Sequence, residues 1–282
     1  MGVLSTICVR RFTWNFTDSP KYWANGSPAL SHLLNAYTAL VPDNEKYYIR
    51  VLTACNERIT EADVKRALMD FCRQEALHGL AHQKHWERLR SQNVPIEAYV
   101  SRVNALLYGF LERYQPRRLQ VAIVAAIEHL NASWAHSFLK LNVLKNADPE
   151  LSALFSWHFA EEIEHKSVAF DVLSSVYPGY ATRLLGAILT FPLFYLLVFG
   201  GAALFASKER SERGYSMWAD VRRNVVSTRL ARALLQETFR YMRPGFRPSE
   251  VDDYDLAKDA LKTLAIRKRP SATVQPDARA NA

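Results

Sequence analysis

Glycine and proline are sparse in this chain, with 10 and 12 among 282 residues. Their scattered positions exclude fibrous and low-complexity proteins, and the stretches between them are rich in Ala, Leu, Glu and Arg, which favours helix. Cys8, Cys55 and Cys72 form no CxxC pair, which argues against a disulfide framework and for a reducing compartment. The chain also lacks the HExxH, GxSxG, GxGxxG and P-loop patterns of single-zinc proteases, nucleophile-elbow hydrolases and nucleotide-binding proteins.

Positive charge is in modest excess, because 36 basic residues stand against 28 acidic ones for a net charge of +8. Most basic residues are interleaved with acidic ones. No nucleic-acid motif accompanies the local excess at 222–232 and 267–269, so we expect no nucleic-acid partner. The first apolar run is too short for a signal peptide. We therefore expect a cytoplasmic protein.

Hydrophobic spacing predicts an all-α protein, with Pro42 read as a stop before the first helix. Helices are expected over 43–56, 60–92, 96–113, 117–144, 150–176, 217–242 and 250–266. The chain then divides into an irregular lead-in over 1–40, a metal-binding helical bundle over 41–180, a hydrophobic helix or hairpin over 181–210, C-terminal helices over 211–269 and a disordered tail over 270–282.

Two segments carry the same Glu-x-x-His pattern. Glu75 precedes His78, and Glu162 precedes His165. Three residues turn a helix through about 300°, so each Glu and His lie on one face, one turn apart, where both reach the same metal ion. A single such pair is often a solvated ion pair, whereas two of them are more specific.

Two further glutamates lie on apolar helical stripes. Glu128 shares a face with several alanines, and Glu45 shares one with Tyr48 and Leu52. A lone ionised carboxylate on a core face is costly, and a metal ion compensates for it. One Glu from each of two helices, with Glu-x-x-His from each of two others, is typical of the ferritin-like four-helix bundle that binds two iron or manganese ions.

Other histidines fall near these positions. His158 lies four residues before Glu162 and seven before His165, so it shares their face as a third ligand from one helix. His82 lies one turn beyond His78, as an extra ligand or a residue that holds a carboxylate.

Three acidic or histidine side chains remain to be placed. His129 points about 100° away from Glu128 and is expected to support a ligand or to lie on the surface. Glu161 falls near the ligand face and is expected as a possible supporting residue or extra ligand, although the Glu-x-x-His spacing selects Glu162. Glu164 should point away.

The motifs resemble those of a bacterial family of predicted metal-dependent hydrolases. The resemblance rests on residues 41–45, 74–82, 125–132, 157–171 and 243–248. The segment WHFAEEIEHKSVAFD at 157–171 is highly specific, whereas Asn44 stands where the family usually has Gly, and Arg247 where it usually has His. The ligand set also resembles that of the di-iron N-oxygenases that oxidise aryl amines, which share the extra histidine, here His158. That second resemblance implies dioxygen activation.

We therefore expect two metal ions, iron by preference and manganese or zinc as alternatives. The expected ligands are Glu45, Glu75, His78, Glu128, His158, Glu162 and His165. The first functional hypothesis is a di-iron oxidoreductase or oxygenase acting on a small organic substrate. The alternatives are a hydrolase that uses hydroxide generated at a dinuclear metal site, and a non-catalytic metal-binding protein. An oxygenase needs an electron-donor protein, and a homodimer is left open.

Residues Leu184–Ala206 form 23 consecutive uncharged positions, enough to span about 30 Å of hydrocarbon as a helix. Arg183 precedes them, and Lys208 and Arg210 follow. Two interpretations stay open. The segment is either a helix or shallow hairpin that docks on the inner membrane, which would suit a lipophilic substrate, or a helix that is buried against the bundle.

Overall fold

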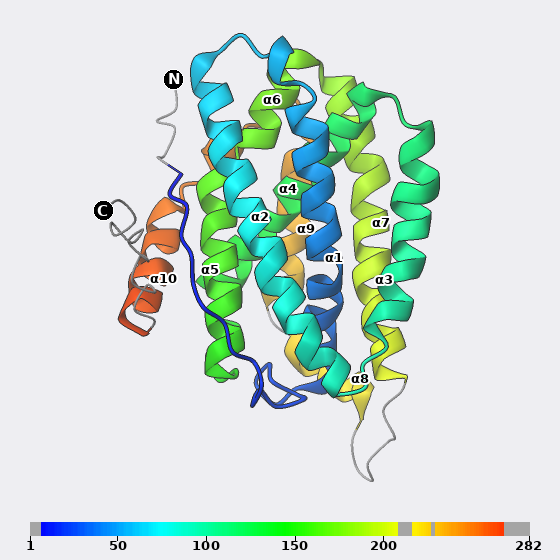
Figure 1. The fold of residues 1–282 in the computed structure, drawn as a ribbon, viewed down its shortest axis with the longest axis vertical. Coiled ribbons are helices and arrows are strands. Elements are labelled where there is room, and N and C mark those ends of the chain that lie inside the picture. Colours follow the sequence, from blue (N-terminus) through cyan, green and yellow to red (C-terminus); the bar gives the residue numbers. More distant parts are fainter. Residues whose placement is uncertain (1–6, 208–215, 227–228, 268–282) are drawn as a thin grey trace, which may run out of the picture.

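The computed structural model describes residues 7–207, 216–226 and 229–267, and no strand occurs among them. The predicted all-α class is confirmed (Figure 1). The α-helices are α1 (Pro28–Thr53), α2 (Ala62–Ser91), α3 (Ile96–Asn104), α4 (Arg117–Lys140), α5 (Pro149–His165), α6 (Val168–Val176), α7 (Tyr180–Ala206), α8 (Met217–Val221), α9 (Arg229–Tyr241) and α10 (Tyr254–Arg267). Shorter helical turns are η1 (Asn56–Arg58), η2 (Ala105–Leu111), η3 (Glu112–Tyr114), η4 (Arg222–Val226) and η5 (Pro248–Glu250), of which η2 and η4 are π-helical.

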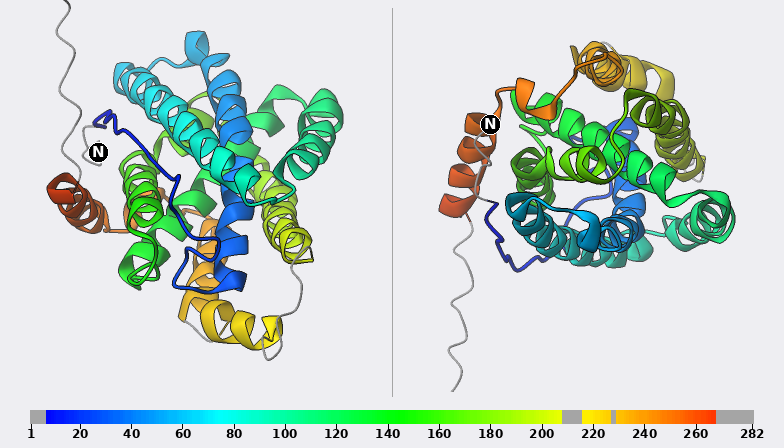
Figure 2. Two further views of the ribbon diagram at one scale, coloured as in Figure 1. Left: turned by 60° about the horizontal axis from the view of Figure 1, so that its bottom comes forward. Right: turned by 90° about the horizontal axis from the view of Figure 1, so that it is seen from above.

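The long helices form a bundle. α1 packs against α2, α4 packs against α5, and α7 lies across α1 and α4 (Figures 1 and 2). α10 packs on the outer side of α5. Residues 7–27 pass along α5 and α2 before α1 begins (Figure 1), and the ring of Trp14 packs on that of Trp157. Other parts of the chain therefore pack over the four helices α1, α2, α4 and α5.

The first helix begins at Pro28 rather than near residue 43, so the expected lead-in over 1–40 is wrong from that point onward. Ser27 caps the helix by accepting a hydrogen bond from the Leu30 amide, and Pro28 occupies a first-turn position that suits proline. Pro42 lies inside α1 without ending it. Because Pro42 has no N–H, the carbonyl of Thr38 is left free, and it accepts a bond from the Trp86 indole of α2 instead.

Several expected helices are divided. The segment expected over 150–176 forms α5 and α6, separated at Lys166 and Ser167. The Lys166 side chain is buried there, where it pairs with the Asp253 carboxylate and donates to the Val251 carbonyl. This contact holds the chain before α10 against the end of α5. The expected helices over 96–113 and 217–242 each change to π-helix partway.

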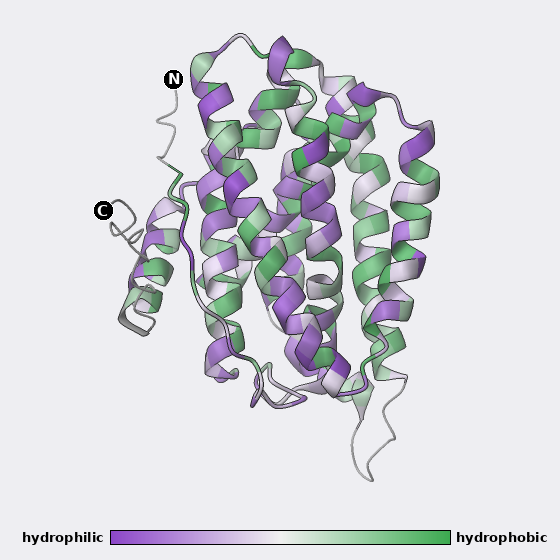
Figure 3. Ribbon diagram, in the orientation of Figure 1, coloured by the Kyte–Doolittle hydropathy of each residue, from purple (hydrophilic) through white to green (hydrophobic). Residues whose placement is uncertain are grey.

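α7 is one continuous helix through Pro192, so the hairpin alternative is wrong. It is long and apolar enough to cross a membrane, and 33% of its most apolar window is buried. Figure 3 shows mainly hydrophobic colours along it. Gly186 permits close packing, because a Cβ there would lie 2.6 Å from the Ala122 carbonyl oxygen of α4. The opposite face exposes large apolar side chains, among them Ile188 and Leu196.

Of the basic residues that flank the uncharged segment 184–206 in the sequence, the structure describes only Arg183. Arg183 is buried, and its guanidinium donates to the backbone carbonyls of Tyr241 and Arg243. It therefore fixes α7 to the end of α9 rather than facing a lipid headgroup. Lys208 and Arg210, as well as the tail from Pro270, lie outside the described residues.

Candidate metal centre

Side chains from four helices meet in the interior of the bundle. α1 contributes one carboxylate, α4 another, α2 one Glu-x-x-His pair and α5 the second pair with an additional histidine one turn earlier. None of these side chains is more than 3% exposed. They are Glu45, Glu75, His78, Glu128, His158, Glu162 and His165, the same seven residues that the sequence predicts as metal ligands.

The seven side chains form two groups. The first group contains Glu45, His78, His158 and Glu162, and the second contains Glu75, Glu128 and His165. Within each group the possible ligand atoms all lie within 4.8 Å of one another. Each group joins carboxylate and imidazole, which together suit Fe, Mn or Zn.

Two carboxylates face both groups. Glu162 places Oε1 2.8 Å from His158 Nε2 and Oε2 3.1 Å from His165 Nε2. Glu75 Oε1 lies 3.2 Å from His165 Nε2 and 3.7 Å from His78 Nδ1. Carboxylates in such positions can bridge two ions, so the arrangement suits a dinuclear centre better than two separate sites.

Several fully buried polar atoms in this cluster have no hydrogen-bond partner among the residues that the structure describes. They are Oε2 of Glu45 and Glu128, both oxygens of Glu75 and Nδ1 of His78. Buried carboxylate oxygens without a partner are strongly unfavourable. Bound cations would coordinate these atoms, so the residues present fit a metal centre.

The electrostatics point the same way. Burial, together with the neighbouring carboxylates, raises the pKa of Glu45 and Glu128 well above the ordinary value. Burial alone would raise the pKa of Glu162 too, but His165 and His158 hold that pKa well below its usual range. Burial would lower the pKa of His78, yet its carboxylate neighbours raise it to about 10. In the metal-free protein, bound protons and charged histidines compensate the negative charge of the buried carboxylates. Divalent metal ions can compensate it in their place.

Each of the three histidines has one nitrogen facing the carboxylates and the other held from outside. His78 donates from Nε2 to Glu161 Oε2 at 3.0 Å, and Arg10 donates to the other Glu161 oxygen at 3.1 Å. His165 donates from Nδ1 to the side-chain oxygen of Gln74 at 3.0 Å. These contacts leave His78 Nδ1 and His165 Nε2 directed at the cluster, as in many metal sites.

His158 is held by a longer chain of contacts. Its Nδ1 lies 2.7 Å from His82 Nε2, and His82 Nδ1 lies 3.1 Å from the Thr38 hydroxyl. The Tyr37 hydroxyl is 3.4 Å from His158 Nε2 and donates to Asn131 at 3.3 Å. His82 is thus beside a predicted ligand rather than in either group.

His129, expected to support a ligand or to lie on the surface, belongs to neither group. Its Nε2 donates to the Glu237 carbonyl of α9 at 2.8 Å, and its ring stacks on Tyr241. The rotation of about 100° from Glu128 directs it out of the bundle interior. Glu164 also points away, toward Arg10 and Gln74.

Sequence reasoning did not find Arg10, Tyr37, Thr38 or Asn131. Arg10 lies 151 positions from Glu161 in the chain, and no local spacing connects them. Tyr37 and Thr38 fell in the segment expected to be irregular. The position of Glu161 next to a predicted ligand was the available signal for Arg10, since a buried carboxylate needs a cation or a hydrogen-bond donor nearby.

Comparison with known proteins gives one match. The family described as predicted metal-dependent hydrolases matches residues 8–252, which include all of the residues of the candidate centre. No curated protein and no solved structure matches the chain. The match covers most of the sequence, and the buried groups of glutamate and histidine agree with a metal-dependent activity. The chain belongs to the family of predicted metal-dependent hydrolases.

Proposed function

We propose that this chain is a metal-dependent hydrolase with two metal ions held by the seven buried glutamates and histidines. The observation that carries the proposal is the position of Glu75 and Glu162, each of which faces ligands of both groups. The family match supports hydrolysis as the activity. Metal ions bound there would supply Lewis acidity and lower the pKa of a water nucleophile.

The chain itself would orient and shield this centre. Glu161 and Gln74 fix the rings of His78 and His165 by accepting their outer N–H groups. The Trp157 ring packs edge-on against His78, with centroids 4.7 Å apart. Trp157 is in turn covered by the aromatic residues of the N-terminal segment. These rings cover the outer side of His78.

The nitrogen of His158 that faces away from the carboxylates, Nδ1, can carry a proton and donate it in a hydrogen bond to His82. When His158 Nε2 faces the carboxylates, its Nδ1 carries hydrogen and donates to His82 Nε2. His82 Nδ1 then donates to the Thr38 hydroxyl. This chain fixes one tautomer for both rings, and Tyr37 places a second hydroxyl beside His158 on the inner side.

A second candidate function is dioxygen activation by a di-iron centre in a ferritin-like bundle. The observation that favours it is the ligand set itself, in which four glutamates and three histidines all come from helices and are all buried. Apart from the additional His158, this ligand set matches the pattern of the ferritin-like di-iron and di-manganese proteins. An oxygenase of this kind would need an electron-donor protein.

The first experiment is elemental analysis of protein purified without added metal. We expect about two ions per chain; iron would favour the second candidate, and zinc the first. The loaded protein is then assayed for ester and phosphodiester hydrolysis and, with ferrous iron and a reductant, for oxygen consumption. A single stoichiometric ion, or none after reconstitution, contradicts a dinuclear centre.

Variants test the assignment of the ligands. Glu128→Ala and His165→Ala should each lose metal while the protein stays soluble. Glu164→Ala is the matched control on α5, because Glu164 is directed toward Arg10 and away from both groups. If Glu164→Ala lost metal and Glu162→Ala kept it, the assigned face of α5 would be wrong.

A further inference from the structure

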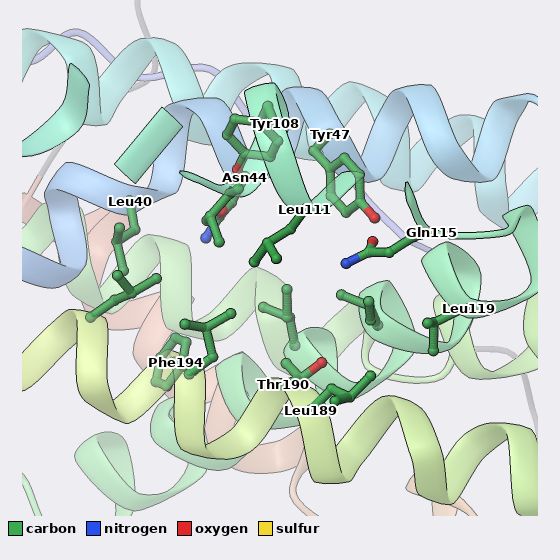
Figure 4. A pocket seen from close by; sticks show the side chains of 15 residues that line it. Leu40, Asn44, Tyr47, Tyr108, Leu111, Gln115, Leu119, Leu189, Thr190 and Phe194 are labelled. Atoms are coloured by element: carbon green, nitrogen blue, oxygen red, sulfur yellow. Dashed lines mark hydrogen bonds between the residues drawn. The ribbon is translucent and has the colours of Figure 1, made fainter. Parts of the chain in front are cut away.

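A cavity of about 240 Å³ lies on the other side of α1 and α4 from the carboxylate cluster, between these helices, η2 and α7 (Figure 4). Its walls are mainly leucine and isoleucine side chains, such as Leu111, Ile123 and Leu193. An apolar cavity of about 150 Å³ is enough to bind benzene. This cavity therefore has room for a larger ring system or a short hydrocarbon chain.

One polar group in the wall is the hydroxyl of Thr190 on α7. This residue is 5% exposed, and its buried hydroxyl oxygen forms no hydrogen bond within the described part of the chain. Figure 4 shows this oxygen at the wall of the cavity, and the Tyr47 hydroxyl and Gln115 amide toward one end. A buried hydroxyl without a partner is unfavourable. A ligand with one hydrogen-bonding group would satisfy it.

The lining carries no Asp, Glu, Lys or Arg among the described residues. An ionised ligand would therefore enter an apolar wall without a counter-charge, which is strongly unfavourable. Leu189 lines the cavity and is 46% exposed, so the cavity opens onto the apolar outer face of α7. An uncharged molecule could enter the cavity at Leu189 from this apolar face.

We infer that this cavity binds an uncharged, hydrocarbon-rich small molecule that forms a hydrogen bond with Thr190. The site is distinct from the candidate metal centre. Asn44 and Ile127 line the cavity, whereas the neighbouring residues in the chain, Glu45 and Glu128, belong to the carboxylate groups. The inference does not depend on which metal is bound or which reaction occurs.

The test uses three probes with the same ring system and different polarity. Equilibrium dialysis of the full-length protein, as purified, measures binding of 2-naphthol, naphthalene and the anion 2-naphthoate. We expect 2-naphthol to bind most tightly and naphthoate not to bind. Thr190→Val keeps the shape of the side chain and removes the hydroxyl. It should weaken the binding of 2-naphthol about 3- to 10-fold, which is the contribution of one hydrogen bond, and leave the binding of naphthalene unchanged.

A second pair of variants locates the site. Leu193→Trp fills the cavity and should weaken both neutral probes more than 10-fold. Leu196→Trp is the matched control, because Leu196 lies on the same helix, is 68% exposed and does not line the cavity. Failure of both neutral probes to bind, equal binding of naphthoate, or equal effects of the two tryptophan variants would overturn the inference. Metal content, measured on the same samples, keeps this result separate from the proposed function.

Discussion

Replacing Glu161 by leucine should weaken metal binding without removing any predicted ligand. Glu161 is fully buried and accepts the outer N–H of His78 at 3.0 Å. Leucine has a similar size but no acceptor, so that N–H loses its buried partner. The His78 ring would still be held by stacking on His158, with centroids 4.4 Å apart, and by its edge contact with Trp157. The ring is thus loosened rather than released.

The expected loss of metal affinity follows from this loosening of the His78 ring. Removing the outer hydrogen-bond partner of a metal-bound histidine typically weakens metal binding about 10- to 100-fold, or roughly 1.4–2.8 kcal/mol. Because stacking still orients His78, we expect Glu161→Leu to fall within that range rather than to abolish binding. Glu161→Gln keeps an acceptor oxygen but loses the charge, so its loss should be smaller.

The assay is competition between the protein and a chromophoric chelator, which gives the stoichiometry and the dissociation constant of each ion. Glu164→Gln is the control, because Glu164 bonds to the same Arg10 and is directed away from both ligand groups. We expect it to change metal affinity by less than about threefold, well below the range for a direct partner. The reasoning is refuted if Glu161→Leu binds metal as tightly as the unaltered chain, or if both variants lose metal equally.

Three further results are expected. Burial and the neighbouring carboxylates raise the pKa of Glu45 and Glu128, so binding of protons to these carboxyl groups stabilises the folded, metal-free protein. That contribution is full below the ordinary value of about 4.3 and is lost as pH rises through the raised values. Metal displaces those protons, so the gain in Tm on adding metal should grow from pH 5 to pH 8, and a constant gain would contradict this. Asp253→Ala leaves the buried Lys166 ammonium uncompensated and should cost about 3–5 kcal/mol in denaturant unfolding, with partial recovery when Lys166→Met is added; equal stability of single variant and parent would be the negative result. The exposed apolar face of α7 should keep part of the protein with membranes through a carbonate wash but not through detergent, and a wholly soluble, monodisperse protein would remove membrane docking.

The sequence located the candidate centre because its ligands obey local rules. Glu75 with His78, and Glu162 with His165, are one helical turn apart, and these spacings do not depend on how the helices pack. Glu128 was recognisable from its apolar stripe. The structure brings all of these side chains together, although their role as ligands stays a prediction until metal binding is measured.

The contacts that hold the ligands are mostly not local, and the sequence could not predict them. Arg10 reaches Glu161 from a segment without regular secondary structure. The same holds for His129, which lies outside both groups: its partner is the Glu237 carbonyl, and a backbone acceptor leaves no signature in the residue type. The apolar cavity had no sequence signal either, because its leucines come from elements far apart in the chain and follow no common period.

The expected start of the first helix after Pro42 places Tyr37 and Thr38 outside the bundle, whereas α1 begins at Pro28 and includes them. Proline inside a helix normally frees the carbonyl four residues earlier at a substantial cost, which is why it was read as a stop. Here the freed carbonyl belongs to Thr38, and the Trp86 indole on α2 satisfies it. The helix can therefore continue on both sides of Pro42. The same Thr38 uses its hydroxyl to hold His82, and Tyr37 beside it reaches His158. A contact between helices thus decides whether these residues belong to the bundle, and no rule applied to residues 28–42 alone contains that contact.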